Sequence, residues 1–169
     1  MSAADPFSPS VILSGDEGTA RFAAVLAAHL RAGDTLLLEG PVGAGKTAFS
    51  RALIQHLLRE DGLPVEDVPS PTFTLVQTYA AQRFDIWHAD LYRLTQPEEV
   101  LELGLAEAFD TALCLIEWPD RLGRDLPETA AVLRFAMEGA EARSITLAGG
   151  ALSDRLAPAF APPPPGATP

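Results

Sequence analysis

Short apolar runs alternate along this chain with longer segments in which apolar residues recur every three or four positions. The run Val11-Ile12-Leu13 predicts a short strand, and Ser14 with Glu17 has the spacing of a capping box that starts a helix. Gly33 is expected to end that helix at its C′ position. One face of the helix carries residues at helical spacing: Phe22, Val25, Leu26, His29 and Leu30.

Residues 35–57 have the pattern of a buried strand, a glycine-rich turn and a second helix. Thr35-Leu36-Leu37-Leu38 suits a strand that is covered on both faces. The segment Gly40-Pro41-Val42-Gly43-Ala44-Gly45-Lys46-Thr47 follows, and apolar residues then return at helical spacing: Phe49, Ala52, Leu53 and Leu57. A strand, a glycine loop and a helix in this order are the context in which phosphate-binding loops occur.

Two pairs of β-favouring segments later in the chain predict hairpins. Residues 74–79 and 83–92 form the first pair, and residues 130–137 and 143–147 form the second. Strands joined by so few residues must be antiparallel. We therefore expect a mixed sheet rather than a purely parallel one.

Two short helices and a core strand are expected between the hairpins. Pro97 favours a helix that ends near Gly104, and residues 106–109 suit a second helix. Residues 113–116, Leu-Cys-Leu-Ile, have the continuous apolar character of a buried strand. Cys114 within it is expected to be a small core residue rather than a reactive thiol.

These elements predict a single-domain α/β protein with a P-loop NTPase fold. We expect a mixed parallel and antiparallel central sheet flanked by helices, with the domain over residues 1–157. Residues 158–169 are rich in alanine and proline, and residues 162–165 are all proline. This composition predicts a disordered tail.

Charge and composition narrow the possible partners. The chain has 12 Lys and Arg against 23 Asp and Glu, so its formal net charge of -11 repels a nucleic-acid backbone. We therefore expect contact with nucleic acid only through other proteins. The first ten residues lack the basic start and apolar core of a signal peptide, and no run reaches the roughly eighteen apolar residues of a membrane span. A cytoplasmic protein is expected.

The glycine-rich segment has the spacing of a phosphate loop that binds a nucleotide with Mg²⁺. Its glycines permit positive φ and let backbone N–H groups approach phosphate oxygens, and the next helix directs its positive end at the same anion. Lys46 is expected to reach the β and γ phosphates, and the Thr47 hydroxyl to bind Mg²⁺. The expected nucleotide-binding residues are Gly40, Val42, Gly43, Ala44, Gly45, Lys46, Thr47 and Ala48.

Two acids at predicted strand ends are candidates for completing a hydrolytic site. Glu117 follows the apolar strand 113–116 as the acid of a Walker B element does, although that acid is usually Asp. Its longer side chain suits either contact with the metal or acceptance of a proton from water. Asp90 closes another strand that is expected to finish beside the phosphates. For each acid the alternative is an exposed strand-end residue, and Asp85 is expected to face solvent.

Three further polar residues have open interpretations. Ser70 and Thr72 lie in a proline-braced loop, where their hydroxyls are candidates for contacts with the γ phosphate or Mg²⁺, and a plain turn explains them almost as well. His88 has no Cys or His partner at zinc-like spacing. A structural or hydrogen-bonding role is therefore preferred for His88 over metal ligation.

Four motifs follow one another along the chain: the glycine loop 40–47, Ser-Pro-Thr-Phe-Thr-Leu-Val over 70–76, His-Ala-Asp-Leu-Tyr-Arg-Leu over 88–94, and Ile-Glu-Trp-Pro over 116–119. In this order they resemble the TsaE (YjeE) family of small bacterial ATPases. The resemblance covers about residues 14–147. It implies a Mg²⁺-dependent ATPase that acts with TsaB and TsaD proteins in making threonylcarbamoyladenosine beside the anticodon of tRNA. Because the sequence shows no obvious second domain to hold a substrate and its acidic charge disfavours direct contact with tRNA, we expect the ATPase to be weak alone and to depend on its partners.

The resemblance also implies roles for individual residues. Lys46 and Thr47 match the family's phosphate and Mg²⁺ positions, and Asp90 matches the acid of its His-x-Asp-Leu-Tyr motif. Glu117 and Trp118 match its Glu-Trp pair. On this basis Lys46, Asp90 and Glu117 are the expected catalytic residues, with Glu117 as the Mg²⁺ ligand beside Thr47 and Asp90 orienting the attacking water.

Two other functions fit the same loop. A small-molecule kinase would use arginines of a lid, for which Arg121 and Arg124 are the candidates, and a nucleotide-sensing adaptor would bind ATP without hydrolysing it. In the ATPase interpretation, hydrolysis is coupled to a partner only by contacts that differ between the ATP and ADP forms. We therefore expect partner docking near the nucleotide, at residues 69–73 and Trp118.

Overall fold

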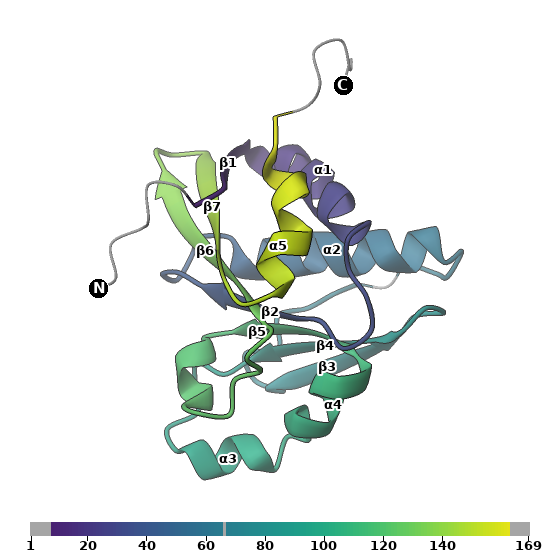
Figure 1. Ribbon diagram of the computed structural model, residues 1–169, viewed down its shortest axis with the longest axis vertical. Coiled ribbons are helices and arrows are strands. Elements are labelled where there is room, and N and C mark those ends of the chain that lie inside the picture. The colour runs from purple at the N-terminus through teal and green to yellow at the C-terminus, as the bar shows by residue number, and fades with distance from the viewer. Residues whose placement is uncertain (1–7, 66, 163–169) are drawn as a thin grey trace.

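One mixed sheet of seven strands forms the centre of the computed structural model, which describes residues 8–65 and 67–162 (Figure 1). The strand order is β1-β7-β6-β2-β5-β4-β3. The strands are β1 Ser10–Ser14, β2 Thr35–Glu39, β3 Val76–Ala80, β4 Asp85–Asp90, β5 Leu113–Glu117, β6 Ala131–Glu138 and β7 Ala142–Gly149.

The strands that position the site are parallel and the edges are antiparallel. β2 pairs in parallel with both β5 and β6, and β4 pairs in parallel with β5. The pairs β3 with β4, β6 with β7 and β1 with β7 are antiparallel. The predictions of a mixed sheet and of both hairpins are confirmed.

Helices cover both faces of this sheet. α1 (Gly15–Ala27), α2 (Lys46–Glu60), α5 (Leu152–Leu156) and the 3-10 helix η2 (Ala157–Phe160) lie on one face, and α3 (Pro97–Leu101) and α4 (Leu105–Thr111) lie on the other (Figure 1). The 3-10 helix η1 (Pro119–Leu122) follows β5. Among the residues described, no helix is both long and apolar enough to span a bilayer.

Alternation of side chains along the central strands fills a core on each face. Leu36 and Leu38 of β2 pack with residues of α1 and α2, whereas Leu37 packs with residues of α3 and α4. Successive side chains of a strand point to opposite faces, so a strand covered by helices on both sides needs no polar position. Cys114 belongs to the second core and is fully buried, as predicted. Burial raises the pKa of its thiol to about 12.

The first helix ends earlier than its apolar pattern predicts. α1 stops at Ala27, and Val25 is 51% exposed instead of lying on the buried face. The backbone N–H groups of His29 and Leu30 bond to carbonyls three residues back, which tightens the chain into a turn. Gly33 then donates its N–H to the carbonyl of Ala112, so it docks this turn against the start of β5 rather than capping α1.

The predicted start of the disordered tail at residue 158 is wrong. Pro158 to Phe160 belong to η2, and the ring of Phe160 lies edge-on to the ring of Phe22 of α1, with 5.0 Å between the ring centroids. Leu152, Leu156 and Phe160 are all buried. Their four-residue spacing supplies one apolar face, so the packed domain extends at least to Phe160. Residues 163–169 of the expected tail lie outside the described residues.

The loop before β3 forms a tight turn that positions Thr72. Leu75 has a φ of 67° and donates its backbone N–H to the carbonyl of Pro71 at 2.7 Å. The strand therefore begins at Val76, two residues later than predicted. The Asp90 backbone N–H bonds to the carbonyl of Leu75, which holds this turn against the end of β4.

Candidate nucleotide and metal site

The loop between β2 and α2 has the backbone geometry of a phosphate loop. Gly40 has a φ of 143°, and a Cβ at this position would lie 2.5 Å from the carbonyl oxygen of Phe135 on β6. Gly45 has a φ of 100°, and a Cβ there would collide with the guanidinium group of Arg143 on β7. Both conformations require glycine. α2 begins immediately afterwards at Lys46, so its unpaired N–H groups face the same space.

A cavity of about 430 Å³ opens at this loop. Six of the eight predicted nucleotide-binding residues line it, together with both predicted acids. The exceptions are Gly40, whose carbonyl contacts Lys46, and Ala44, whose side chain is buried in the core. The lining residues are Val42, Gly43, Gly45, Lys46, Thr47, Ala48, Thr72, Asp90, Tyr92, Glu117, Trp118 and Arg143.

The Lys46 ammonium group is held at the floor of this cavity. Nζ donates to the carbonyl oxygens of Gly40 at 2.5 Å and Pro41 at 2.8 Å, and it lies 4.3 Å from the centre of the Trp118 ring. Burial lowers the pKa of Lys46, while the carboxylates of Glu117 and Asp90 raise it. The charge is thus fixed at the loop but poorly hydrated, which strengthens its attraction for a phosphate.

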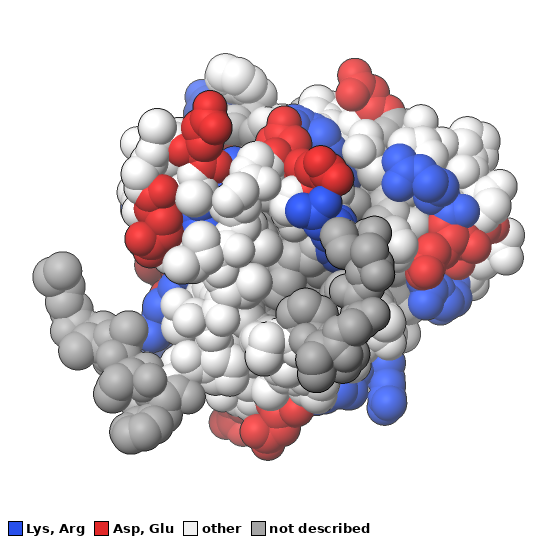
Figure 2. Space-filling model, turned by 90° about the horizontal axis from the view of Figure 1, so that it is seen from above, with Lys and Arg blue, Asp and Glu red and all other residues white. Residues whose placement is uncertain are grey.

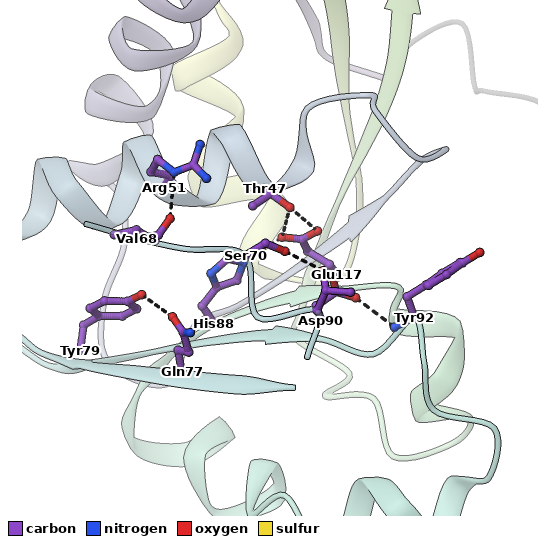
Figure 3. Close-up of polar contacts among 11 residues, drawn as sticks. Thr47, Arg51, Val68, Ser70, Gln77, Tyr79, His88, Asp90, Tyr92 and Glu117 are labelled. Atoms are coloured by element: carbon purple, nitrogen blue, oxygen red, sulfur yellow. Dashed lines mark hydrogen bonds and ion pairs between the residues drawn. The ribbon is translucent and has the colours of Figure 1, made fainter. Parts of the chain in front are cut away.

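Glu117 joins the end of β5 to the first turn of α2. The Thr47 hydroxyl lies 3.0 Å from Oε1 and 2.9 Å from Oε2 of Glu117, and Nε2 of His88 lies 2.8 Å from Oε1 (Figure 3). Glu117 and His88 are buried. The alternative of an exposed strand-end acid is therefore wrong for Glu117.

Asp90 is held at the end of β4 by a different set of donors. Oδ2 accepts a hydrogen bond from the Thr72 hydroxyl at 3.0 Å, and Oδ1 accepts one from the Tyr92 backbone N–H at 3.0 Å. The Ser70 hydroxyl lies 2.7 Å from that of Thr72. Asp90 is 5% exposed, so it is not a solvated strand-end residue either, whereas Asp85 faces solvent as predicted. Of the two loop hydroxyls, that of Thr72 contacts the acid and fixes its orientation, and that of Ser70 contacts Thr72.

Two lining residues were not singled out in the sequence. Arg143 comes from the second hairpin and lies against Gly45, and its buried Nη1 has no hydrogen-bond partner among the described residues. No local motif marks this arginine, because its position depends on β7 pairing with β6 beside the loop. Tyr92 lies within the His-x-Asp-Leu-Tyr motif, and its ring packs on Trp118 with centroids 4.9 Å apart.

The oxygen atoms at this site suit Mg²⁺ bound together with a nucleotide. Mg²⁺ prefers oxygen ligands and in such sites takes one or two from the protein and the rest from phosphates and water. The Thr47 hydroxyl and the Glu117 carboxylate provide that number. The part of the chain that the structure describes has no group of three or more His, Cys, Asp or Glu residues able to hold a metal by themselves.

Comparisons with known proteins agree with this geometry. The family model described as "Threonylcarbamoyl adenosine biosynthesis protein TsaE" matches residues 13–145. A tRNA threonylcarbamoyladenosine biosynthesis protein TsaE from Rickettsia felis is 46% identical over 110 residues, which are 65% of this chain and 62% of that protein, so the match spans less than two thirds of its length. The protein of the same name from a Nostoc species is 36% identical over 155 residues, covering 87% of this chain and 91% of the relative.

A solved structure has the same fold. The crystal structure of Bacillus subtilis YdiB superimposes with a TM-score of 0.72 and 28% sequence identity, covering 89% of this chain and 92% of that chain. The family match thus extends over most of the residues that build the sheet and the phosphate loop. The chain belongs to the TsaE family and has its P-loop fold.

Proposed function

We propose that this protein binds ATP with Mg²⁺, hydrolyses it, and thereby supports threonylcarbamoyladenosine formation on tRNA together with TsaB and TsaD. The observation that carries the proposal is the contact between Thr47 at the start of α2 and Glu117 at the end of β5. This contact brings the two oxygen ligands of a nucleotide-bound Mg²⁺ together on a phosphate loop.

Each residue of the site has a role in this proposal. Lys46 and the loop N–H groups bind the β and γ phosphates, and Thr47 and Glu117 hold the Mg²⁺, which neutralises phosphate charge when bound. Because the Thr47 hydroxyl donates its hydrogen to Glu117, its lone pairs remain available on the cavity side. Asp90, oriented by Thr72 and the Tyr92 N–H, accepts a hydrogen from the attacking water.

Arg143 adds a second cation to the phosphate site. It lies against the residue that precedes Lys46, and its buried Nη1 lacks a partner among the described residues. A buried donor without a partner costs about 1–3 kcal/mol, so a phosphate or ribose oxygen that accepts its hydrogen recovers that energy on binding. We assign Arg143 to nucleotide binding.

Exposed apolar side chains at the rim support docking of a protein partner. Val42 of the loop is 75% exposed, Phe73 is 82% exposed, and Tyr92 is 49% exposed. The guanidinium of Arg93 stands 5.0 Å from the centre of the Phe73 ring. These residues come from segments that line the nucleotide cavity, so we expect a bound nucleotide to change their arrangement. Their position supports docking near residues 69–73 and Trp118.

The charges on the surface favour an indirect contact with tRNA. Basic residues on the face seen in Figure 2 are interspersed with acidic ones and do not gather into one basic patch. With a net charge of -11, the chain as a whole repels a phosphate backbone. We therefore assign tRNA recognition to the partners.

The kinase alternative has less support. Arg121 and Arg124, the candidates for its catalytic arginines, are not among the residues that line the nucleotide cavity. Arg124 instead lines a separate pocket beside α3 and α4. Among the described residues, neither arginine therefore lines the cavity at the phosphate loop, where a kinase would need it.

The test is phosphate release from ATP and Mg²⁺ by the full chain, alone and with purified TsaB and TsaD. We expect slow release alone and faster release with the partners, and tighter association in the presence of a non-hydrolysable ATP analogue than with ADP. Transfer of the γ phosphate to a small acceptor would establish the kinase alternative. Nucleotide-dependent association without release would establish the adaptor, and no ATP binding would overturn all three.

A further inference from the structure

A histidine buried behind the site, His88, contacts the proposed Mg²⁺ ligand directly. Its side chain is fully buried, and Nε2 lies 2.8 Å from Oε1 of Glu117 (Figure 3). Neither the phosphate loop nor the hydrolytic roles assigned above use this residue. It also lies too deep to touch the nucleotide, because it is not among the residues that line the cavity.

The strand register explains why His88 meets Glu117. β4 and β5 run parallel, with Asp90 opposite Glu117 and His88 opposite Leu115. Residues two apart on a strand share a face, so His88 and Asp90 both point toward α2, where Leu115 and Glu117 also point. His88 lies two residues before Asp90 on β4, so it contacts Glu117 diagonally across the two strands. Thr47 contacts Glu117 from α2.

The chemistry of the pair determines which atom donates. An ionised carboxylate only accepts hydrogen bonds, so the contact requires a hydrogen on Nε2 of His88. His88 then donates to Oε1 of Glu117, and the single hydrogen of the Thr47 hydroxyl is shared between Oε1 and Oε2. A glutamate loses more side-chain freedom than an aspartate when it is held in one conformation. The buried imidazole ring supplies a fixed point for this longer side chain.

We propose that His88 is a positioning residue that orients Glu117 toward Thr47 and thereby sets the affinity of the site for Mg²⁺ in the nucleotide complex. The inference rests on the proposed function, because it takes Glu117 as the Mg²⁺ ligand. Hydrogen-bond partners of metal ligands commonly change metal affinity by about 10–100-fold when they are removed. His88 would act only through Glu117 and would leave phosphate contacts unchanged.

The test is a Mg²⁺ titration of fluorescent ADP bound to the full chain. His88→Leu should lower the apparent Mg²⁺ affinity by about tenfold or more. ADP affinity in EDTA should stay within about twofold of the wild type. His88→Gln, which keeps a donor near the position of Nε2, should recover most of the loss. Ile86→Val is the matched control, because it trims a buried side chain on the same face of β4 without touching Glu117.

A spectroscopic measurement keeps the proposal testable if His88→Leu does not fold. In the wild type with ¹⁵N-labelled histidine, Nε2 of His88 should be protonated in both the ADP and the Mg²⁺–ADP complexes. An Nε2 atom without a bound hydrogen would overturn the inference. An unchanged Mg²⁺ affinity in folded His88→Leu would overturn it too. If Mg²⁺ does not strengthen nucleotide binding in the wild type, the proposed function itself fails. If Mg²⁺ strengthens binding in the wild type and only the His88 results disagree, the inference about His88 fails alone.

Discussion

Replacing Asp90 with asparagine separates the activation of water from nucleotide binding. The two oxygens of Asp90 accept hydrogen bonds from the Tyr92 N–H and the Thr72 hydroxyl, each at 3.0 Å. Asparagine keeps both contacts when its oxygen faces Tyr92, because the Thr72 hydroxyl can accept from the amide instead. The free energy of unfolding should therefore change by less than about 1 kcal/mol. Alanine would leave the partly buried Tyr92 N–H group without its acceptor, and the lost stability would obscure a change in turnover.

The expected loss is confined to turnover. Accepting a proton in the transition state typically contributes about 10²–10⁴-fold to the rate. At about 1.4 kcal/mol for each factor of ten, this is roughly 3–5 kcal/mol of activation free energy. We expect kcat for ATP hydrolysis to fall by at least about a hundredfold. ATP affinity should stay within about twofold, because Lys46 and the loop are unchanged.

The assay is single-turnover hydrolysis of radiolabelled ATP with TsaB and TsaD present, alongside a titration with a fluorescent ATP analogue. Asp85→Asn is the matched control, since it makes the same change of charge on the same strand at an exposed position. Normal hydrolysis by Asp90→Asn would refute the role given to Asp90. An equal loss of binding and turnover would assign Asp90 to nucleotide binding instead.

The remaining predictions concern the side chains of Arg143 and Lys46, the hydroxyl group of Thr47, and Phe160 of η2. Arg143→Gln should weaken ADP binding by about tenfold, as expected for a lost charged hydrogen bond, whereas Arg21→Gln at an exposed pair on α1 should not change it in the same titration. Burial lowers the pKa of Lys46 from its ordinary value of 10.5, so the amine loses its charge at a lower pH than a free lysine does. ATP affinity should therefore decrease as the pH is raised, and the decrease should begin below pH 10.5. In Lys46→Arg the affinity should stay constant over the same pH range. Thr47→Ala should abolish the Mg²⁺ dependence of ADP binding while binding in EDTA persists, and an unchanged Mg²⁺ dependence would contradict its role. Phe160→Ala should lower the free energy of unfolding in urea by about 3 kcal/mol, whereas no change would mean that η2 does not pack on Phe22.

The sequence of neighbouring residues is sufficient to predict the phosphate loop and the core strands. The loop depends on residues that are neighbours in sequence, since Gly40, Gly45, Lys46 and Thr47 act through one turn of backbone and the helix that follows it. The continuous apolar runs at 35–38 and 113–116 likewise identified buried strands, because helices cover both faces of the sheet. The hairpins followed from short connections, which permit only antiparallel pairing.

The contacts that distinguish the site depend on strand order, which no local pattern encodes. Thr47 and Glu117 are 70 residues apart and meet only because β2 and β5 pair in parallel. Arg143 reaches Gly45 only because β7 lies beside β6, and its segment looks like any other strand. The end of α1 and the packing of Phe160 likewise depend on what else covers that face of the sheet. Propensity and periodicity report which side of an element is apolar, but the partner that buries it is selected by the free energy of the whole packed arrangement.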